Sequence, residues 1–249
     1  FLYHIICPLK IASMEKIYIN DLAKVSNVTH AIGIDAGGNT VLIGKSNLAA
    51  DIANYIPATK GEVWIAYLDN LNRIALIPWD QWSTSRTDAA GIAIISGGRR
   101  LVIAPHEALL RWGSTTGSGG AVTATTKEAA DIDYAGKSNT GKITTSAAFS
   151  GDGEGYAPGY CAAYSNGGVT AGSWWLPSLG ELGLIYEKLD AINVALAKIS
   201  GATQIPTIGH WASTENSETS AWVMGISTGT RGTYSKTNNE FRARPVTTF

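Results

Sequence analysis

The chain has 249 residues, which is enough for one large domain or two smaller ones with a substantial core. A net charge of −1 provides no basic field of the kind that drives nucleic-acid binding, so we expect no nucleic-acid partner. Charged residues make up only 16% of the chain and glycine contributes 28 positions. This composition is typical of a β-rich and loop-rich extracellular or virion-surface protein rather than of a cytosolic enzyme.

We expect neither a membrane span nor an export signal in the first residues. Residues 1–13 are apolar, but Pro8 and Lys10 interrupt them, and the stretch is too short to cross a bilayer. It also lacks the charged front and the small-residue cleavage site of a signal peptide. Because Met14 reads as a natural start, we interpret residues 1–13 as a non-native or upstream extension. No membrane insertion is expected, and delivery outside a cell would use another route, such as assembly into a phage particle.

Residues 14–84 predict a small β-rich N-terminal domain for attachment or oligomerisation. The β-type runs "HAIGI" (30–34) and "TVLIG" (40–44) flank Gly37 and Gly38, which favours a hairpin over the phosphate-binding hairpin of a sugar kinase. The runs "EVWIAYL" and "RIALIPW" predict a second hairpin around "DNLN" (69–72). "AADIANYI" predicts a short helix, and Asp80–Ala89 reads as a polar connector.

The second zone opens with two β-branched runs around Gly97 and Gly98, which predict a hairpin. The stretch 126–143 predicts one helix within a long Gly/Ser/Thr-rich region. Inside it, residues 136–142 have the spacing of a phosphate-binding loop, but Ile143 stands where the chemistry needs Ser or Thr, so we interpret them as a surface loop. The acidic stretch "GDGEG" (151–155) favours a solvated turn over a calcium site.

The third zone begins with "GSWWLPSLGELGLIY" (172–186), in which Ser178 and Glu181 form a capping box. One buried helical face follows, and Gly201 suits the end of the helix. That face consists of Leu182, Ile185, Leu189, Ile192, Leu196 and Ile199. Strands are then predicted at "GHWAST", "AWVMGIS" and "FRARPV", and Ser227–Glu240 reads as a polar hairpin loop or a pair of exposed strand ends.

Isolated reactive side chains favour structural roles. The two cysteines, Cys7 and Cys161, have unlike contexts, so buried free thiols are favoured over a disulfide between them. No Cys/His cluster predicts a metal site, and no motif predicts a cofactor. The four histidines have no nucleophile beside them. Arg242 and Arg244 alternate on one strand, where internal ion pairs are favoured over an anionic ligand.

The combination of "WWLPSLGEL", "HWASTE", "AWVMGIS" and "FRARPV", in this order, resembles a bacterial and phage version of the C-type lectin fold. This version is related to formylglycine-generating enzymes, and "AGIAIISGGRRLVIAPHEALLRWG" and "DYAGKSNTGKI" resemble its start. The resemblance covers roughly residues 85–249. It implies an α+β fold with a small twisted antiparallel sheet, two helices and long loops. Some members are variable proteins of diversity-generating retroelements, including the phage major tropism determinants, in which a C-terminal segment is mutagenised.

Two departures from the family limit what the resemblance implies. The EPN, QPD and WND motifs of calcium-dependent sugar-binding lectins do not occur in the sequence. Formylglycine-generating enzymes use a pair of cysteines, whereas this region has only Cys161. We therefore expect no enzyme, no catalytic residues and no bound metal.

The resulting hypothesis is a phage-encoded ligand- or receptor-binding protein with a diversifiable surface in residues 210–249. Its expected contact residues are Glu215, Asn216, Ser217, Glu218, Thr219, Thr230, Arg231, Thr233, Tyr234, Lys236, Asn238 and Asn239. The expected partners are a surface protein or glycan receptor, and the virion or other copies of the chain, with a trimer as one candidate. We expect the protein at a virion surface or outside the cell. The alternatives are a formylglycine-generating-enzyme-like oxidoreductase and a structural virion decoration or fibre protein.

Overall fold

The computed structural model describes residues 30–34, 40–44, 63–237 and 240–249. The chain divides into two compact units, Phe1–Ala58 and Thr59–Phe249. In the first unit, β1 (His30–Ile34) and β2 (Thr40–Gly44) pair in antiparallel register, as the sequence predicts. The turn between them, residues 1–13 with Cys7, and the predicted helix near residue 50 lie outside the described residues.

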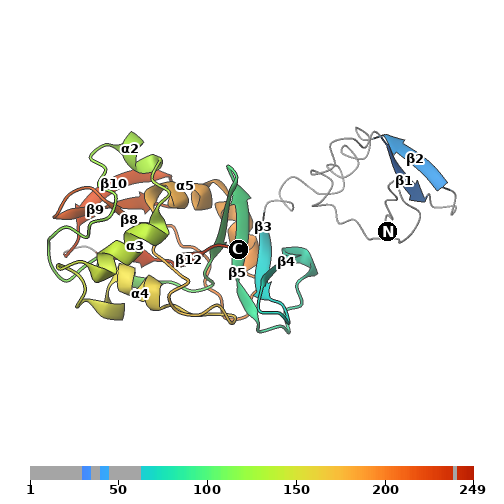
Figure 1. Cartoon of the computed structure of the whole chain (residues 1–249), viewed down its shortest axis with the longest axis horizontal. Coiled ribbons are helices and arrows are strands. Elements are labelled where there is room, and N and C mark those ends of the chain that lie inside the picture. The colour runs from blue at the N-terminus through green and yellow to red at the C-terminus, as the bar shows by residue number, and fades with distance from the viewer. Residues whose placement is uncertain (1–29, 35–39, 45–62, 238–239) are drawn as a thin grey trace. The chain divides into compact units, whose positions relative to one another are not determined.

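The second unit contains two five-stranded sheets and several short helices (Figure 1). Its strands are β3 (Val63–Leu68), β4 (Ile74–Pro78), β5 (Ala89–Ser96), β6 (Arg99–Ile103), β7 (Ala108–Leu110), β8 (Gly209–Glu215), β9 (Ser220–Gly225), β10 (Thr230–Ser235), β11 (Phe241–Ala243) and β12 (Val246–Thr247). Its helices are α2 (Lys127–Asp131), α3 (Gly136–Thr145), α4 (Ala157–Ala163), α5 (Leu179–Glu187) and α6 (Leu189–Leu196), with 3-10 turns η2 (Trp79–Gln81) and η3 (Gly153–Gly155). The unit is therefore α+β, as expected.

The first large sheet has the order β12-β6-β5-β3-β4, with every neighbouring pair antiparallel. Two of the hairpins predicted from the sequence, β3–β4 and β5–β6, are present in it. Gly97 and Gly98 turn the β5–β6 hairpin with φ angles of 55° and 75°, which glycine adopts without steric cost. Strand β5 is buried almost throughout because the sheet is covered on both faces.

The expected domain boundary between residues 84 and 85 is wrong. Strand β3 pairs with β5 along its length, from Val63 opposite Ile94 to Tyr67 opposite Ala89. Residues 63–78 therefore belong to the same sheet as β5, and the division of the chain falls after Ala58. A polar connector such as Asp80–Ala89 identifies a loop, but it does not show whether the flanking strands share a sheet.

The second large sheet has the order β10-β9-β8-β11-β7. Its pairs are antiparallel except for the parallel contact between β8 and β11, at His210 and Arg242. Helix α5 packs against one face of this sheet and α3 and α4 against the other. Six of the fourteen residues of the polar segment 227–240 form the edge strand β10, which agrees better with the second of the two predictions, exposed strand ends, than with a loop.

The main core lies between the two large sheets, where α5 and α6 contribute the apolar face expected from the sequence. Trp222 and Met224 from β9 meet this face from one side, and Ile92 and Ile94 from β5 meet it from the other. A second cluster, which includes Trp112 and Trp211, lies between β8–β9 and the helices α3 and α4.

Three helix predictions need correction. The single helix expected from Ser178 to Gly201 is two helices, because Lys188 has a non-helical backbone between α5 and α6. This break lets α5 lie on one sheet and α6 on the other. The surface loop expected at residues 136–142 is most of α3, whose polar Asn139 and Thr140 are buried and hydrogen-bonded. The resemblance implied two helices, whereas the described residues contain five α-helices.

Candidate binding surface

Glu215 and Lys236, which we expected to contact a ligand, are buried instead. Their side chains are 1% and 0% exposed, and the Lys236 ammonium donates a hydrogen bond to Glu215 Oε1. Glu215 ends β8 and Lys236 follows β10, so the pair closes one end of the second sheet. The polar composition of this segment predicted exposure, and a buried, paired charge has no distinct sequence signature that would have predicted otherwise.

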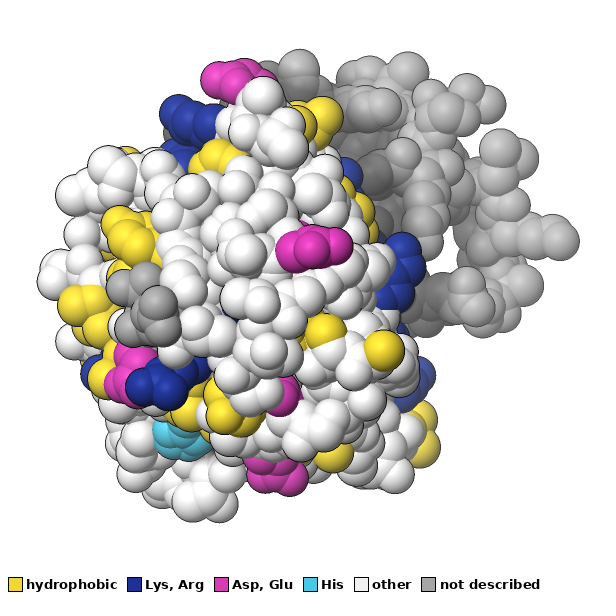
Figure 2. Space-filling model, turned by 90° about the vertical axis from the view of Figure 1, so that its left-hand side faces the viewer, with side chains coloured by type: hydrophobic (Ala, Val, Ile, Leu, Met, Phe, Trp, Pro, Cys, Tyr) yellow, Lys and Arg dark blue, Asp and Glu magenta, His cyan; other side chains and the backbone are white. Residues whose placement is uncertain are grey.

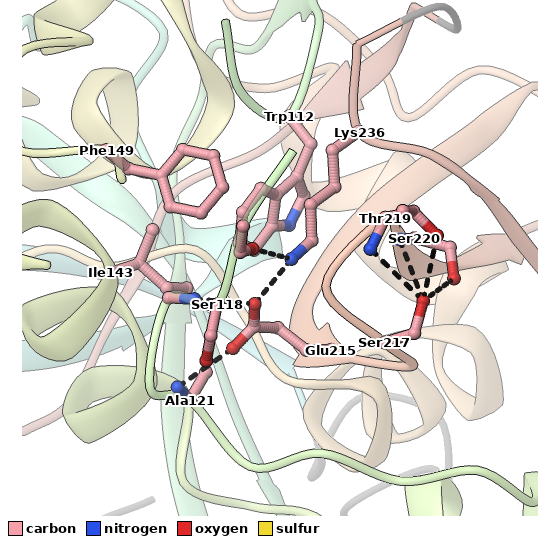
Figure 3. A network of polar contacts seen from close by, with 12 residues as sticks. Trp112, Ser118, Ala121, Ile143, Phe149, Glu215, Ser217, Thr219, Ser220 and Lys236 are labelled. Atoms are coloured by element: carbon pink, nitrogen blue, oxygen red, sulfur yellow. Dashed lines mark hydrogen bonds and ion pairs between the residues drawn. The ribbon is translucent and has the colours of Figure 1, made fainter. Parts of the chain in front are cut away.

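This ion pair holds a loop that the sequence analysis did not include in the site, residues 113–123, hereafter the glycine loop. Glu215 Oε1 accepts from the Gly119 amide at 2.8 Å, and Oε2 accepts from the Ala121 amide at 3.0 Å (Figure 3). Lys236 Nζ donates to the Gly117 carbonyl at 2.8 Å and lies 4.6 Å from the centre of the Trp112 ring. These side-chain hydrogen bonds of Glu215 and Lys236 are thus all made to the glycine loop or between the two residues.

Burial lowers the pKa of Lys236, and the hydrogen bond and negative charge of Glu215 oppose that shift. A desolvated ammonium is costly unless a counter-charge and acceptors surround it, and here Glu215 and the Gly117 carbonyl supply both. The glycine at position 119 is also required by space, because an added Cβ would lie 2.7 Å from Ile143 and 3.3 Å from the Glu215 carboxylate. The loop is therefore tightly fitted to the sheet.

The turn between β8 and β9 lies beside the glycine loop and is exposed. The Gly117 amide donates to the Glu218 carbonyl at 2.9 Å, and the Lys236 amide donates to the Thr219 carbonyl at 3.1 Å. The Ser217 hydroxyl is within 3.1 Å of the Thr219 hydroxyl and 2.8 Å of the Ser220 hydroxyl (Figure 3). These contacts join two segments, about 100 residues apart in sequence, into one surface, which we call the loop end.

The loop end consists of residues 114–123, 216–219 and Thr237. Its exposed side chains are mainly hydroxyls and short apolar groups, with Glu218 as an exposed charge. The face in Figure 2 shows the same character, since uncharged polar side chains and backbone cover most of it. The Gly/Ser/Thr-rich composition was the signal that could have identified residues 114–123 as part of the site.

The other predicted contact residues do not join this surface. Arg231 binds Asp131 of α2 at 2.8 Å and lies with Thr230 at the far end of β10. Thr233 and Tyr234 are both exposed, but neighbouring residues of a strand point to opposite faces. Asn238 and Asn239 lie outside the described residues. The structure thus brings together Asn216, Ser217, Glu218 and Thr219, and separates them from Thr230 and Arg231.

Arg242 and Arg244 form internal ion pairs, which was the favoured interpretation. Arg244 is 1% exposed and donates to Glu107 Oε2 at 2.7 Å, while Arg242 lies 3.5 Å from Glu107 Oε1. His210 Nε2 is 3.1 Å from the same carboxylate. Burial would raise the pKa of Glu107, but the His210 hydrogen bond and the Arg244 charge hold it below its usual range.

The acidic stretch considered for calcium has a hydrogen-bonded carboxylate, and the cysteine of this unit is buried. The carboxylate of Asp152, in the acidic stretch considered for calcium, accepts from the Ser114 amide at 2.9 Å. Among the described residues, no group of three or more His, Cys, Asp or Glu side chains is arranged to hold a metal. Cys161 is a buried free thiol, and burial raises its pKa well above the usual value, which disfavours the reactive thiolate.

A hollow of about 310 Å³ lies between α3 and α4, with Phe149, Asp152 and Tyr156 among its lining residues. A second hollow, of about 360 Å³, lies at the outer end of β7 and β11. Within the described part of the chain, no helix is long and apolar enough to cross a membrane.

Comparison with known proteins places the chain in no established family. No family model matches it, and no curated protein matches its sequence. Among solved structures, the chain is similar to a fimbrial protein from Bacteroides ovatus ATCC 8483, with 20% identity and a TM-score of 0.47. The likeness covers 60% of this chain and 35% of that chain, and at this level it indicates no function.

Proposed function

We propose that the chain is a ligand-binding protein that recognises a receptor through its loop end, without a metal ion. The observation that carries this proposal is the buried Glu215–Lys236 pair beneath two exposed segments. The pair fixes the backbone of the glycine loop from below, and backbone hydrogen bonds join that loop and Lys236 to the β8–β9 turn. The side chains above the pair can therefore vary at little cost to the fold. A rigid scaffold under variable loops is a common arrangement in recognition proteins.

The chemistry of the loop end supports binding rather than catalysis. The hydroxyl groups of the β8–β9 turn, such as those of Ser217 and Thr219, hydrogen-bond with one another, and the Ser114 hydroxyl donates to the Asp152 carboxylate. Three charged groups with shifted pKa values, Lys236, Glu107 and Arg244, are buried in ion pairs. An oxidase of the formylglycine-generating type would need a second cysteine beside Cys161, and the sequence from residue 85 onward contains none.

The finer parts of the proposal rest on the sequence motifs. We propose that the second unit is a C-type lectin-type domain whose C-terminal segment is diversifiable, and that it is displayed on a phage particle or outside a cell. Trp174, Trp175 and Leu176 are buried, and Glu181 caps α5, as the motif "WWLPSLGEL" requires of a scaffold element. Residues 1–58 would attach the domain to the virion or to further copies of the chain.

Binding to intact bacterial cells would test the function. The full chain, fluorescently labelled, would be incubated with a panel of gut bacterial strains, with a Glu218→Arg/Thr219→Arg variant beside it. Because two large cations would replace an anionic side chain and a small hydroxyl side chain at the loop end, we expect about a tenfold loss of binding to any strain that the natural chain binds. An Asn70→Arg/Leu71→Arg variant places two arginines on the exposed β3–β4 turn, a charge change of +2 against +3 for the loop-end variant, and serves as the control.

The melting temperature of all three proteins should agree within about 2 °C, because the changed side chains are exposed. The proposal would be wrong if no strain bound the natural chain. It would also be wrong if the loop-end variant and the β3–β4 control bound equally well.

A further inference from the structure

The hollow between α3 and α4 has a buried aromatic floor. Trp112 and Phe149 line it and are almost fully buried, and their rings meet edge to face with centres 5.1 Å apart (Figure 3). Ile143 of α3 belongs to the same apolar cluster and lines the hollow as well. The volume of about 310 Å³ is within the ~300–1,000 Å³ range of small-ligand sites. The floor therefore offers rings and an aliphatic group to a small apolar body.

Two carboxylates lie at the rim of the same hollow. Asp152 is half-buried and Glu154 is exposed, and both are among its lining residues. A Cβ at Gly113 would lie 2.6 Å from the Phe149 ring and 3.3 Å from Asp152 Oδ2, so this oxygen and the ring edge are close neighbours. Among the described residues that line the hollow there is no Lys, Arg or His. The rim is therefore negatively charged beside an aromatic floor.

Close backbone packing and hydrogen bonds fix the rim. A Cβ at Gly159 of α4 would lie 1.8 Å from the Gly153 carbonyl oxygen, so the turn η3, which carries Glu154, rests directly on α4. The Ser114 amide donates to the Asp152 carboxylate at 2.9 Å, and the Ser114 hydroxyl donates to it as well. Because a carboxylate has about four acceptor sites, Asp152 keeps acceptor capacity for a ligand.

We propose that this hollow binds a small organic amine, with the ammonium group at the rim and the apolar body on the aromatic floor. The inference goes beyond the proposed receptor function and does not depend on it. The ammonium would donate a charge-assisted hydrogen bond to Asp152, and Glu154 would add negative charge beside it. The body would pack against Phe149, whose ring also attracts a nearby cation through its quadrupole.

Charge favours an amine over other ligands of the same shape. A neutral apolar ligand would cover the Asp152 carboxylate without replacing its hydrogen bonds to water, which is costly, and an anion would be repelled. The Lys236 ammonium lies 5.3 Å from the centre of the Phe149 ring, but Lys236 is fully buried and Glu215 neutralises its charge. The charges that line the hollow are thus the two carboxylates.

Titrations of the full chain with three probes of nearly equal shape would test the inference. The probes are 2-phenylethylamine, 2-phenylethanol and phenylacetate, which are cationic, neutral and anionic at neutral pH. Heteronuclear NMR detects binding, and the indole signal of Trp112 reports on the floor of the hollow. We expect saturable binding of the amine with a Kd no weaker than about 1 mM, binding of the alcohol at least about fivefold weaker, and no binding of phenylacetate.

Variants of the rim locate the site. Asp152→Asn should weaken amine binding about fivefold, while its side-chain carbonyl can still accept from the Ser114 amide. Glu154→Gln should weaken it about threefold, because the exposed charge is more strongly screened by water. Glu128→Gln removes an exposed carboxylate from α2, outside the hollow, and should bind the amine as the natural chain does.

The inference is overturned if 2-phenylethylamine shows no saturable binding, or if 2-phenylethanol binds equally well. It is also overturned if Glu128→Gln weakens binding as much as Asp152→Asn does. The titrations need no receptor, so their result is independent of the proposed function.

The amine group has two sources, a free amine or the lysine side chain of a receptor, and cell binding separates them. If excess 2-phenylethylamine displaces the chain from a strain that it binds, and excess 2-phenylethanol does not, the source is a receptor lysine. Displacement by neither probe identifies a free amine.

Discussion

Glu215 and Lys236 show how a charged pair can belong to a binding site without touching the ligand. Both are almost completely buried, and together they make three hydrogen bonds to the backbone of the glycine loop. Removing one member of a buried pair leaves the other without its counter-charge, which generally costs about 3–5 kcal/mol. Replacing both members by apolar groups generally costs less.

We therefore predict that Glu215→Gln lowers the free energy of unfolding by about 3 kcal/mol. The Lys236 ammonium would then be buried against a neutral amide. The Glu215→Gln/Lys236→Met double variant should recover part of that loss, because no charge is left unpaired. Urea unfolding followed by tryptophan fluorescence gives these values. If the loss in the double variant equalled the sum of the losses in Glu215→Gln and Lys236→Met alone, the two charges would not be coupled.

Glu181 is the second buried carboxylate whose chemistry can be tested at the residue level. Burial raises its pKa to about 7, and Asp133 adds to the rise, while the hydrogen bonds from the Ser178 amide and the Trp175 indole oppose it. Between pH 4.5 and 7, the folded chain therefore keeps a proton that the unfolded chain releases. This contribution to stability is complete below pH 4.5 and disappears as the pH rises to 7.

Glu181→Gln cannot ionise, and its amide oxygen can still accept from Ser178 and Trp175. We predict that, between pH 4.5 and 7, the natural chain loses up to about 3 kcal/mol of unfolding free energy relative to this variant. Urea titrations at several pH values measure the difference between the two proteins, in which the other titrating groups cancel. Parallel pH profiles of the two proteins would contradict the raised pKa.

At the level of elements, local sequence signals predicted hairpins and caps well. The β5–β6 turn needs two residues with positive φ, and Gly97 and Gly98 provide them, so a short motif is sufficient. The capping box at Ser178 and Glu181 is likewise present at the start of α5. These elements were predictable because their determinants lie within a few residues of one another.

Elements that depend on distant partners were not predictable in the same way. Helix α3 has a weakly helical sequence, but Asp133 binds Asn139, and Thr140 binds the Leu176 amide. Gly136 looks like a phosphate-loop glycine, yet it is required because a Cβ there would lie 2.1 Å from Glu181 Oε2. The constraints from Leu176 and Glu181 come from residues about 40 positions away, which local patterns do not contain.

The candidate site was predicted only in part, for the same reason. The β8–β9 turn was recognisable from its polar residues, and Ser217–Thr219 is indeed exposed or half-exposed. The glycine loop became part of the site only through its bonds to Glu215, a residue that sequence polarity had placed at the surface. Residue type indicates polarity, whereas burial of a charge depends on a partner that the fold brings to it.

At the level of the whole molecule, the limits of the second unit determine which fragment can fold. The boundary between the two units follows Ala58, and the first large sheet includes β3 between β4 and β5. Val63 and Ile65 of β3 are fully buried in the main core, where each contributes about 1.5–3 kcal/mol. Without β3 and β4, this core would open and β5 would become an unprotected edge.

We predict that a fragment of residues 59–249 unfolds cooperatively, whereas a fragment of residues 85–249 does not. The shorter fragment loses several fully buried side chains, and their combined contribution is comparable to the ~5–15 kcal/mol total stability of an ordinary domain. Thermal unfolding followed by near-ultraviolet circular dichroism, which reports fixed tryptophan environments, distinguishes the two. A sharp transition in the 85–249 fragment would mean that β3 and β4 are an appendage of the sheet. The lack of one in the 59–249 fragment would mean that residues 1–58 are needed for the core.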